Sequence, residues 1–167
     1  MQYISDGGDS NEFSSSSSVP VAFFPSLNLV DLEACPNLKG WWKRRDSSVE
    51  VNGDNAHLCS SFPLLSTLRI WGCPMLTSML MFPHLEEKLI LCNANLKPLQ
   101  QTMKMNMSFT PLSKLKHLKL ISIAELKTLP EEWLLSLTSL ESLLIWHCHR
   151  VESLSPGIQH LTALQDL

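Results

Sequence analysis

A repeated spacing of apolar residues is the feature that most constrains how this chain can fold. Counted from a leucine at position 0, apolar residues recur at +3, +5, +8, +11 and +14 in four separate places. The four copies begin at Leu27, Leu65, Leu115 and Leu140. Matches at six positions in four places are not accidental, so we expect one structural unit to recur along most of the chain.

Two further copies of this frame are imperfect. After Leu85 the next anchor is Leu89, a gap of four residues instead of three, and leucines 96 and 99 come one residue early. We expect this third repeat to be distorted. A last copy holds only its first two anchors before the sequence ends inside an expected strand. We interpret the chain as a fragment or a truncated gene product.

The pattern L-x-x-L-x-L-x-x-C-x-L is the leucine-rich repeat. Side chains at +3 and +5 share one face of a short strand and point to the core, while the +8 cysteine turns inward to meet buried backbone groups. One repeat cannot bury its own apolar face, so repeats stack strand beside strand. We predict an α/β fold, a right-handed leucine-rich-repeat solenoid (β-α superhelix) with a parallel concave sheet, an irregular convex side and few helices.

The frame also predicts where each element lies. The expected strands are 29–32, 67–70, 89–91, 117–120 and 142–145. We expect a short helix at 130–135, because Pro130 suits the first helical position and the acids after it complement the helix dipole. No such helix is obvious elsewhere. Residues 1–22 are a Ser-rich lead-in that we expect to be disordered. The repeat domain then covers 23–167, with loop excursions near 43–61 and 100–110.

Charge and hydropathy exclude several classes of function. Thirteen Lys and Arg against sixteen Asp and Glu give a formal charge of -3, which argues against nucleic acid as a partner. The longest apolar stretches are broken within a few residues by Pro, Lys or Glu, so we expect no membrane span. The amino-terminal residues lack the features of a secretory signal. We therefore expect a cytoplasmic protein, with a nuclear location as the alternative.

Several phrases resemble the C-terminal repeats of plant disease-resistance proteins, the nucleotide-binding leucine-rich-repeat immune receptors of the coiled-coil type. These phrases are FPSL (24–27), CPNLKGW (35–41), FPLL (62–65), WGCPML (71–76), LKTLPE (126–131) and LTSLESL (137–143). The resemblance implies an intracellular receptor region that detects pathogen molecules or restrains the nucleotide-binding domain. The chain has no G-x-x-x-x-G-K-[ST] phosphate loop, so nucleotide binding belongs to parts outside it.

Residues that could carry chemistry favour a structural reading. Cys148 occupies the inward +8 position between His147 and His149. We expect both histidine side chains to point away from Cys148, so that the three do not converge on a metal. The acids at 86, 87, 131 and 132 come as adjacent pairs, which do not face a common substrate. We therefore expect no enzyme activity, no catalytic or metal site, and no cofactor.

The strand residues expected on the concave face are the candidate partner site. Trp71 and Trp146 share the +6 position with Ile121, where a solvent-facing ladder should be polar. Exposed aromatic residues aligned on one face favour protein binding. The candidate contacts are Asp31, Glu33, Arg69, Trp71, His117, Lys119, Ile121, Leu144, Trp146 and His147.

Three functions are therefore open at the level of sequence. We expect a non-enzymatic recognition module for a pathogen-derived or host protein, involved in the defense response. The second possibility is an autoregulatory scaffold, in which these residues pack on the receptor's own nucleotide-binding domain. The third is a truncated product without independent activity.

Overall fold

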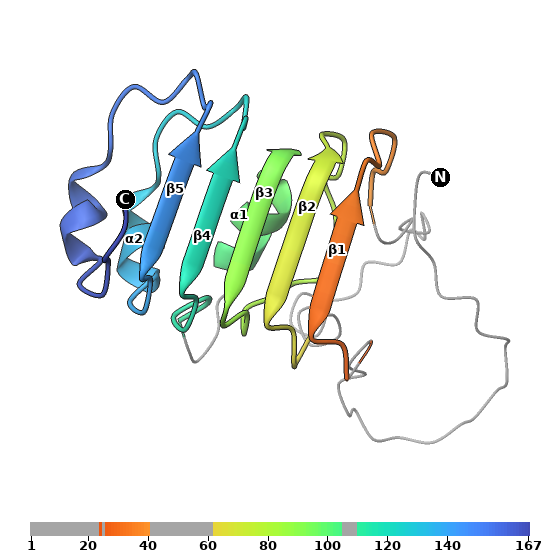
Figure 1. The fold of residues 1–167 in the computed structure, drawn as a ribbon, viewed down its shortest axis with the longest axis horizontal. Helices are drawn as coiled ribbons and strands as arrows, with labels where there is room; N and C mark the ends of the chain where they lie inside the picture. The colour runs from red at the N-terminus through yellow and green to blue at the C-terminus, as the bar shows by residue number, and fades with distance from the viewer. Residues whose placement is uncertain (1–23, 25, 41–61, 105–109) are drawn as a thin grey trace, which may run out of the picture.

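The computed structural model describes residues 24, 26–40, 62–104 and 110–167. Within them the strands form a five-stranded parallel sheet in the order β1-β2-β3-β4-β5, the order of the chain (Figure 1). The strands are β1 (Leu29–Glu33), β2 (Thr67–Cys73), β3 (Lys88–Ala94), β4 (His117–Ile121) and β5 (Ser142–Trp146). All five predicted strands are confirmed in one sheet, and the α/β class with few helices is confirmed. The second and third strands run further than predicted.

The register of the sheet follows the repeat frame. Leu68 pairs with Val30 on one side and Leu89 on the other, and Leu118 and Leu143 continue this +3 row. All five of these side chains are buried. Neighbouring side chains of a strand point to opposite faces, and burial alternates along β1, β4 and most of β2, which gives the sheet one core face and one outer face. β3 departs from this alternation, because Ile90 on the outer face is buried as well.

The extra residue of the third repeat forms a bulge at the entrance to β3. Elsewhere one carbonyl accepts two successive N–H groups of the next repeat: Ser66 O, for example, accepts from Glu87 N and Lys88 N. In the third repeat Glu86 O accepts from Lys116 N and Glu87 O from His117 N. Two successive carbonyls therefore accept the two N–H groups that a single carbonyl accepts elsewhere. The predicted distortion of the third repeat lies at this point. Leu96 and Leu99 are both buried despite arriving early.

A left-handed residue occurs at the +7 position of every repeat, with φ between 46° and 64°. It directly follows the last residue of β1, β4 and β5, and it is the next-to-last residue of β2 and β3. These residues are Ala34, Gly72, Asn93, Ser122 and His147. The left-handed conformation is unfavourable for residues with a Cβ, so its recurrence shows that the chain leaves the sheet by the same turn each time. The frame predicts the position of this turn but not its conformation, since only one of the five residues is glycine.

Two short helices lie between strands, and a 3-10 turn follows the last strand. α2 (Glu131–Ser136) confirms the helix expected at 130–135, although Pro130 is its N-cap and not its first residue. α1 (Lys97–Met103) and the 3-10 turn η1 (Pro156–His160) are also present, where no helix was obvious from the sequence. Figure 1 shows α1 behind β3. The loop expected at 100–110 therefore begins inside a helix.

Several sequence predictions fall outside the described residues. They are the Ser-rich lead-in at 1–22, the excursion at 43–61 and the middle of the second excursion, 105–109. They stay predictions.

Candidate functional site

The outer face of the sheet carries the residues predicted to bind a partner. It consists of three rows that cross all five strands, at the frame positions +2, +4 and +6. The +6 row is Glu33, Trp71, Cys92, Ile121 and Trp146; the +4 row is Asp31, Arg69, Ile90, Lys119 and Leu144; the +2 row is Leu29, Thr67, Lys88, His117 and Ser142. The structure brings nine of the ten predicted site residues together on this face, and His147 directly follows β5.

The apolar members of the +6 row form one continuous stripe. Trp71 and Trp146 are 40% and 57% exposed. Between them lie Cys92 and Ile121, which are only partly exposed. We call these four residues the outer stripe. Exposed indoles joined by smaller apolar side chains are typical of surfaces that anchor protein partners.

Cys92 is the member of the stripe that sequence reasoning missed. Counting the third repeat from Leu85 places Cys92 at +7, whereas counting back from Leu89 places it at +6 beside Trp71. The gap of four residues between Leu85 and Leu89 indicates that the count should restart at Leu89. The extra residue lies in the bulge at Glu86 and Glu87, before β3 begins. Burial raises the pKa of the Cys92 thiol, so at neutral pH it behaves as a small apolar group.

The amino-terminal end of the face is charged. Asp31 and Arg69 form an ion pair across β1 and β2 with an Nη1–Oδ2 distance of 3.5 Å, both side chains being about two-fifths exposed. The Nε of Arg69 is buried and has no hydrogen-bond partner. With Glu33, Trp71 and Ile90 this pair lines a shallow hollow of about 270 Å³. An indole wall beside carboxylates is a surface on which a partner's polar side chain can be oriented.

The middle of the face is less exposed than the sequence suggested. Lys119, His117, Ile121 and Leu144 are partly buried by their neighbours in the rows. No ion pair or side-chain hydrogen bond within the described residues involves Lys119. The face is therefore acidic at β1, basic over β3 and β4, and apolar at β5.

The cysteines at +8 bond to the backbone as predicted. The thiol of Cys73 donates towards Trp71 O at 3.4 Å and Leu32 O at 3.9 Å, and Cys148 makes the equivalent contacts with Trp146 O and Leu120 O, both at 3.5 Å. Each thus bridges its own repeat and the preceding one. Burial raises the pKa of the Cys73 thiol, opposite to the lowered pKa of a nucleophilic cysteine.

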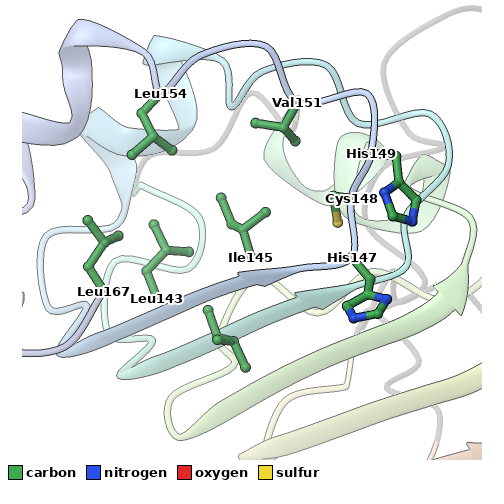
Figure 2. A pocket seen from close by; sticks show the side chains of 9 residues that line it. Leu143, Ile145, His147, Cys148, His149, Val151, Leu154 and Leu167 are labelled. Atoms are coloured by element: carbon green, nitrogen blue, oxygen red, sulfur yellow. The ribbon is translucent and has the colours of Figure 1, made fainter.

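The two histidines that flank Cys148 lie close to each other. The ring centroids of His147 and His149 are 5.8 Å apart, and His147 also contacts Trp146 at 4.3 Å. Both rings lie away from the Cys148 sulfur, as expected, although they are close to each other (Figure 2). Cys148 points elsewhere, and among the described residues no group of three potential ligands is placed to hold a metal ion.

The adjacent acids pair with lysines of the next repeat. Glu86 bonds to Lys114 at 2.9 Å and Glu87 to Lys116 at 2.8 Å, all at the exposed entrance to β3 and β4. Hydrogen bonding and charge from Lys116 lower the pKa of Glu87, and Glu87 raises the pKa of Lys116. The two ion pairs link neighbouring repeats, and the lowered pKa of Glu87 is the opposite of what a general acid requires.

A second hollow, of about 590 Å³, lies at the carboxyl-terminal end of the sheet. Figure 2 shows Leu143, Ile145, Val151 and Leu154 around it, with Leu167 at one end. These are side chains from inward frame positions, so the hollow is core surface. Only the first residues of the last repeat cover it, through the bridge of Asp166 to Ser142 and the bond from Leu143 N to Asp166 O at 3.0 Å.

Comparison with models of known protein families, with curated proteins and with solved structures finds no match to this chain. In the part of the chain that the structure describes, no helix has the length and apolar character needed to cross a bilayer.

Proposed function

We propose that this chain is a non-enzymatic protein-recognition module built as a right-handed leucine-rich-repeat solenoid. The fold assignment is supported by the repeat frame, which holds in register across all five strands, by the left-handed +7 turn of each repeat, and by the +8 thiols that bond to backbone carbonyls. Such arrays offer an extended sheet face for binding.

One observation carries the function: the outer stripe. Trp71, Ile121 and Trp146 lie on the solvent side of the sheet, where polar residues would serve the stability of the fold equally well. Their apolar character therefore indicates a role other than stability. Trp is also among the residues that contribute most to binding free energy. The outer stripe therefore supports a protein partner bound to this face, without nucleic acid, membrane or cofactor.

The resemblance of the repeats to plant nucleotide-binding leucine-rich-repeat receptors supports a role in defense. In that setting the partner is a pathogen-derived or host protein, met in the cytoplasm or nucleus. An autoregulatory contact with the receptor's own nucleotide-binding domain would use the same face, so the experiment has to include both kinds of partner.

The test is a binding titration of the full chain against a receptor nucleotide-binding domain and against candidate pathogen proteins. Replacing Trp71 and Trp146 together with Ala should weaken the relevant complex by about 2 kcal/mol or more, roughly 30-fold. Leu135→Ala is the matched control, since Leu135 is exposed but lies on α2. Circular dichroism checks the fold. Unchanged affinity in the folded double variant would contradict the proposed face, and binding to the nucleotide-binding domain alone would favour autoregulation.

A further inference from the structure

The outer stripe has a length and a direction that restrict what can lie on it. Trp71, Cys92, Ile121 and Trp146 are consecutive partners in the register of β2 to β5, so the stripe runs across the strands. Adjacent strands are about 4.8 Å apart, and three such intervals make the stripe roughly 14 Å long. An apolar segment that covers it must follow this crosswise direction.

A segment in that position cannot extend the sheet. The backbone N–H and C=O groups of β2, β3 and β4 are used within the plane of the sheet, by the neighbouring strands. An extended chain on the face would therefore leave its own polar groups unpaired against indole and aliphatic side chains, which is costly. An α-helix satisfies its backbone internally. Its turn of about 5.4 Å also fits the strand spacing better than the 6.6–6.8 Å between same-face residues of an extended chain.

Charge beside the stripe defines the flank of such a helix. On the amino-terminal side of Ile121 lies Lys119, in the adjacent +4 row, and on the amino-terminal side of Cys92 lies Lys88, one row further, beyond Ile90. Neither lysine side chain takes part in an ion pair or hydrogen bond within the described residues. Lys88 interacts electrostatically with Glu87, but the charge of Glu87 is already balanced by its ion pair with Lys116. The carboxylates of the face are Asp31 and Glu33 on β1, and Asp31 is already paired with Arg69. The field along the middle of the stripe is thus positive.

We propose that the outer stripe binds an acidic amphipathic helix of a partner protein. About ten residues of helix span the stripe, their apolar ridge covers Trp71 to Trp146, and Glu or Asp side chains on one flank face Lys88 and Lys119. The inference rests on the proposed recognition function and specifies its partner. Charge of this kind contributes to association rate and specificity more than to affinity.

Two stapled helical peptides of about 12 residues test the proposal. They share one apolar ridge of Leu and Ile, and their flanks carry Glu in one peptide and Lys in the other. Titration into the full chain at low salt, followed by calorimetry, should show the acidic peptide binding about tenfold more tightly, with the difference shrinking as salt rises. Equal affinities, tighter binding of the basic peptide, or binding of neither would overturn the proposal.

Variants separate this inference from the proposed function. Lys88→Glu with Lys119→Glu should reverse the preference between the peptides. Lys97→Glu with Lys127→Glu, two exposed lysines outside the three rows, should leave it unchanged. If the Trp71→Ala, Trp146→Ala double variant loses a protein partner while the peptides show no charge preference, only the acidic helix is wrong. If that variant keeps its partner, the recognition face itself is wrong.

Discussion

The repeat of β2, in the middle of the sheet, and the repeat of β5, at its carboxyl-terminal end, share the same spacing of apolar residues but bury them to different extents. At +5, Ile70 is 1% exposed, whereas Ile145 is only partly buried. At +14, Met79 is 7% exposed and Leu154 is 44% exposed. The residues of each pair are similarly apolar, so their own sequence does not account for the difference. Burial of a repeat position depends on its having a neighbouring repeat on both sides, since Leu32 at +5 of the first repeat is also only partly buried.

The largest difference in stability between the two regions is expected when an apolar residue of each is replaced by a charged one. Leu68→Asp puts a carboxylate in a fully buried position of β2, which costs several kcal/mol and should unfold most of a marginally stable domain. Leu154→Asp at the end should cost less than about 1 kcal/mol, since half the side chain already meets water. Thermal unfolding followed by circular dichroism measures both. Equal losses would show that the end is as buried as the interior.

A smaller effect comes from cavities at one frame position. Ile70→Ala removes the same atoms as Ile145→Ala, and both residues occupy +5. We expect a loss of about 2–5 kcal/mol at Ile70 and less than half of that at Ile145, where the hollow already admits water. Urea unfolding gives the two values. A larger loss at Ile145 would mean that the terminal repeat is packed more tightly than its exposure indicates.

The strands could be predicted from sequence because their signal is local. An inward residue every second position, anchored by leucines at fixed spacing, specifies β1, β2, β4 and β5 without knowledge of any partner. α1 has a weaker signal. It has a proline, Pro98, in its first turn, but no side-chain cap, no acid in its first turn and no base in its last. Its stability comes from burying Leu99 and Thr102, which depends on packing behind the sheet.

The candidate site was predictable in part for the same reason. The shared +6 position of Trp71, Ile121 and Trp146 follows from the frame alone. Cys92 was lost because a one-residue bulge shifts the count. The hollow at Asp31 and Arg69 joins residues 38 apart in sequence, so it required the register between β1 and β2, which lies across the first long excursion.

The left-handed turns at +7 have the same backbone conformation in the middle repeats and in the last full repeat, so they allow one position to be compared between the two regions. At Gly72 a Cβ would meet Ala34 only at ordinary contact distance, 3.5 Å, so Gly72→Ala should cost about 1 kcal/mol through its φ of 64° alone. His147→Gly, at the same position of the last full repeat, should stabilise by less than about 1 kcal/mol, since glycine also frees the unfolded chain. Opposite signs in thermal unfolding are expected. Stabilisation by Gly72→Ala would contradict a common turn.

The smallest expected effect concerns charge between repeats. Lys116 forms an ion pair with Glu87 at the surface of the middle repeats. It also interacts electrostatically with Glu141, which lies at the start of the last full repeat. The lowered pKa of Glu87 means that its stabilisation is present above the pKa of an unfolded glutamate and is lost as pH falls through the folded value. The raised pKa of Lys116 means that its contribution is present below the pKa of an unfolded lysine and is lost as pH rises through the folded value. Both contributions are therefore present at pH 7.

Glu87→Gln should lower the melting temperature at pH 7 and low salt by no more than about 2 °C, because both side chains of the pair are close to half exposed and screened. The difference from wild type should vanish in high salt and at pH values below the folded pKa of Glu87. Glu141→Gln is the matched change at the end and should have a smaller effect still, since Glu141 interacts with Lys116 without an ion pair. A larger drop in melting temperature from Glu141→Gln than from Glu87→Gln would show that electrostatic stabilisation, unlike apolar packing, is strongest at the last full repeat. The dependence of stability on neighbouring repeats, inferred from Ile70 and Ile145, would then apply to the apolar core alone.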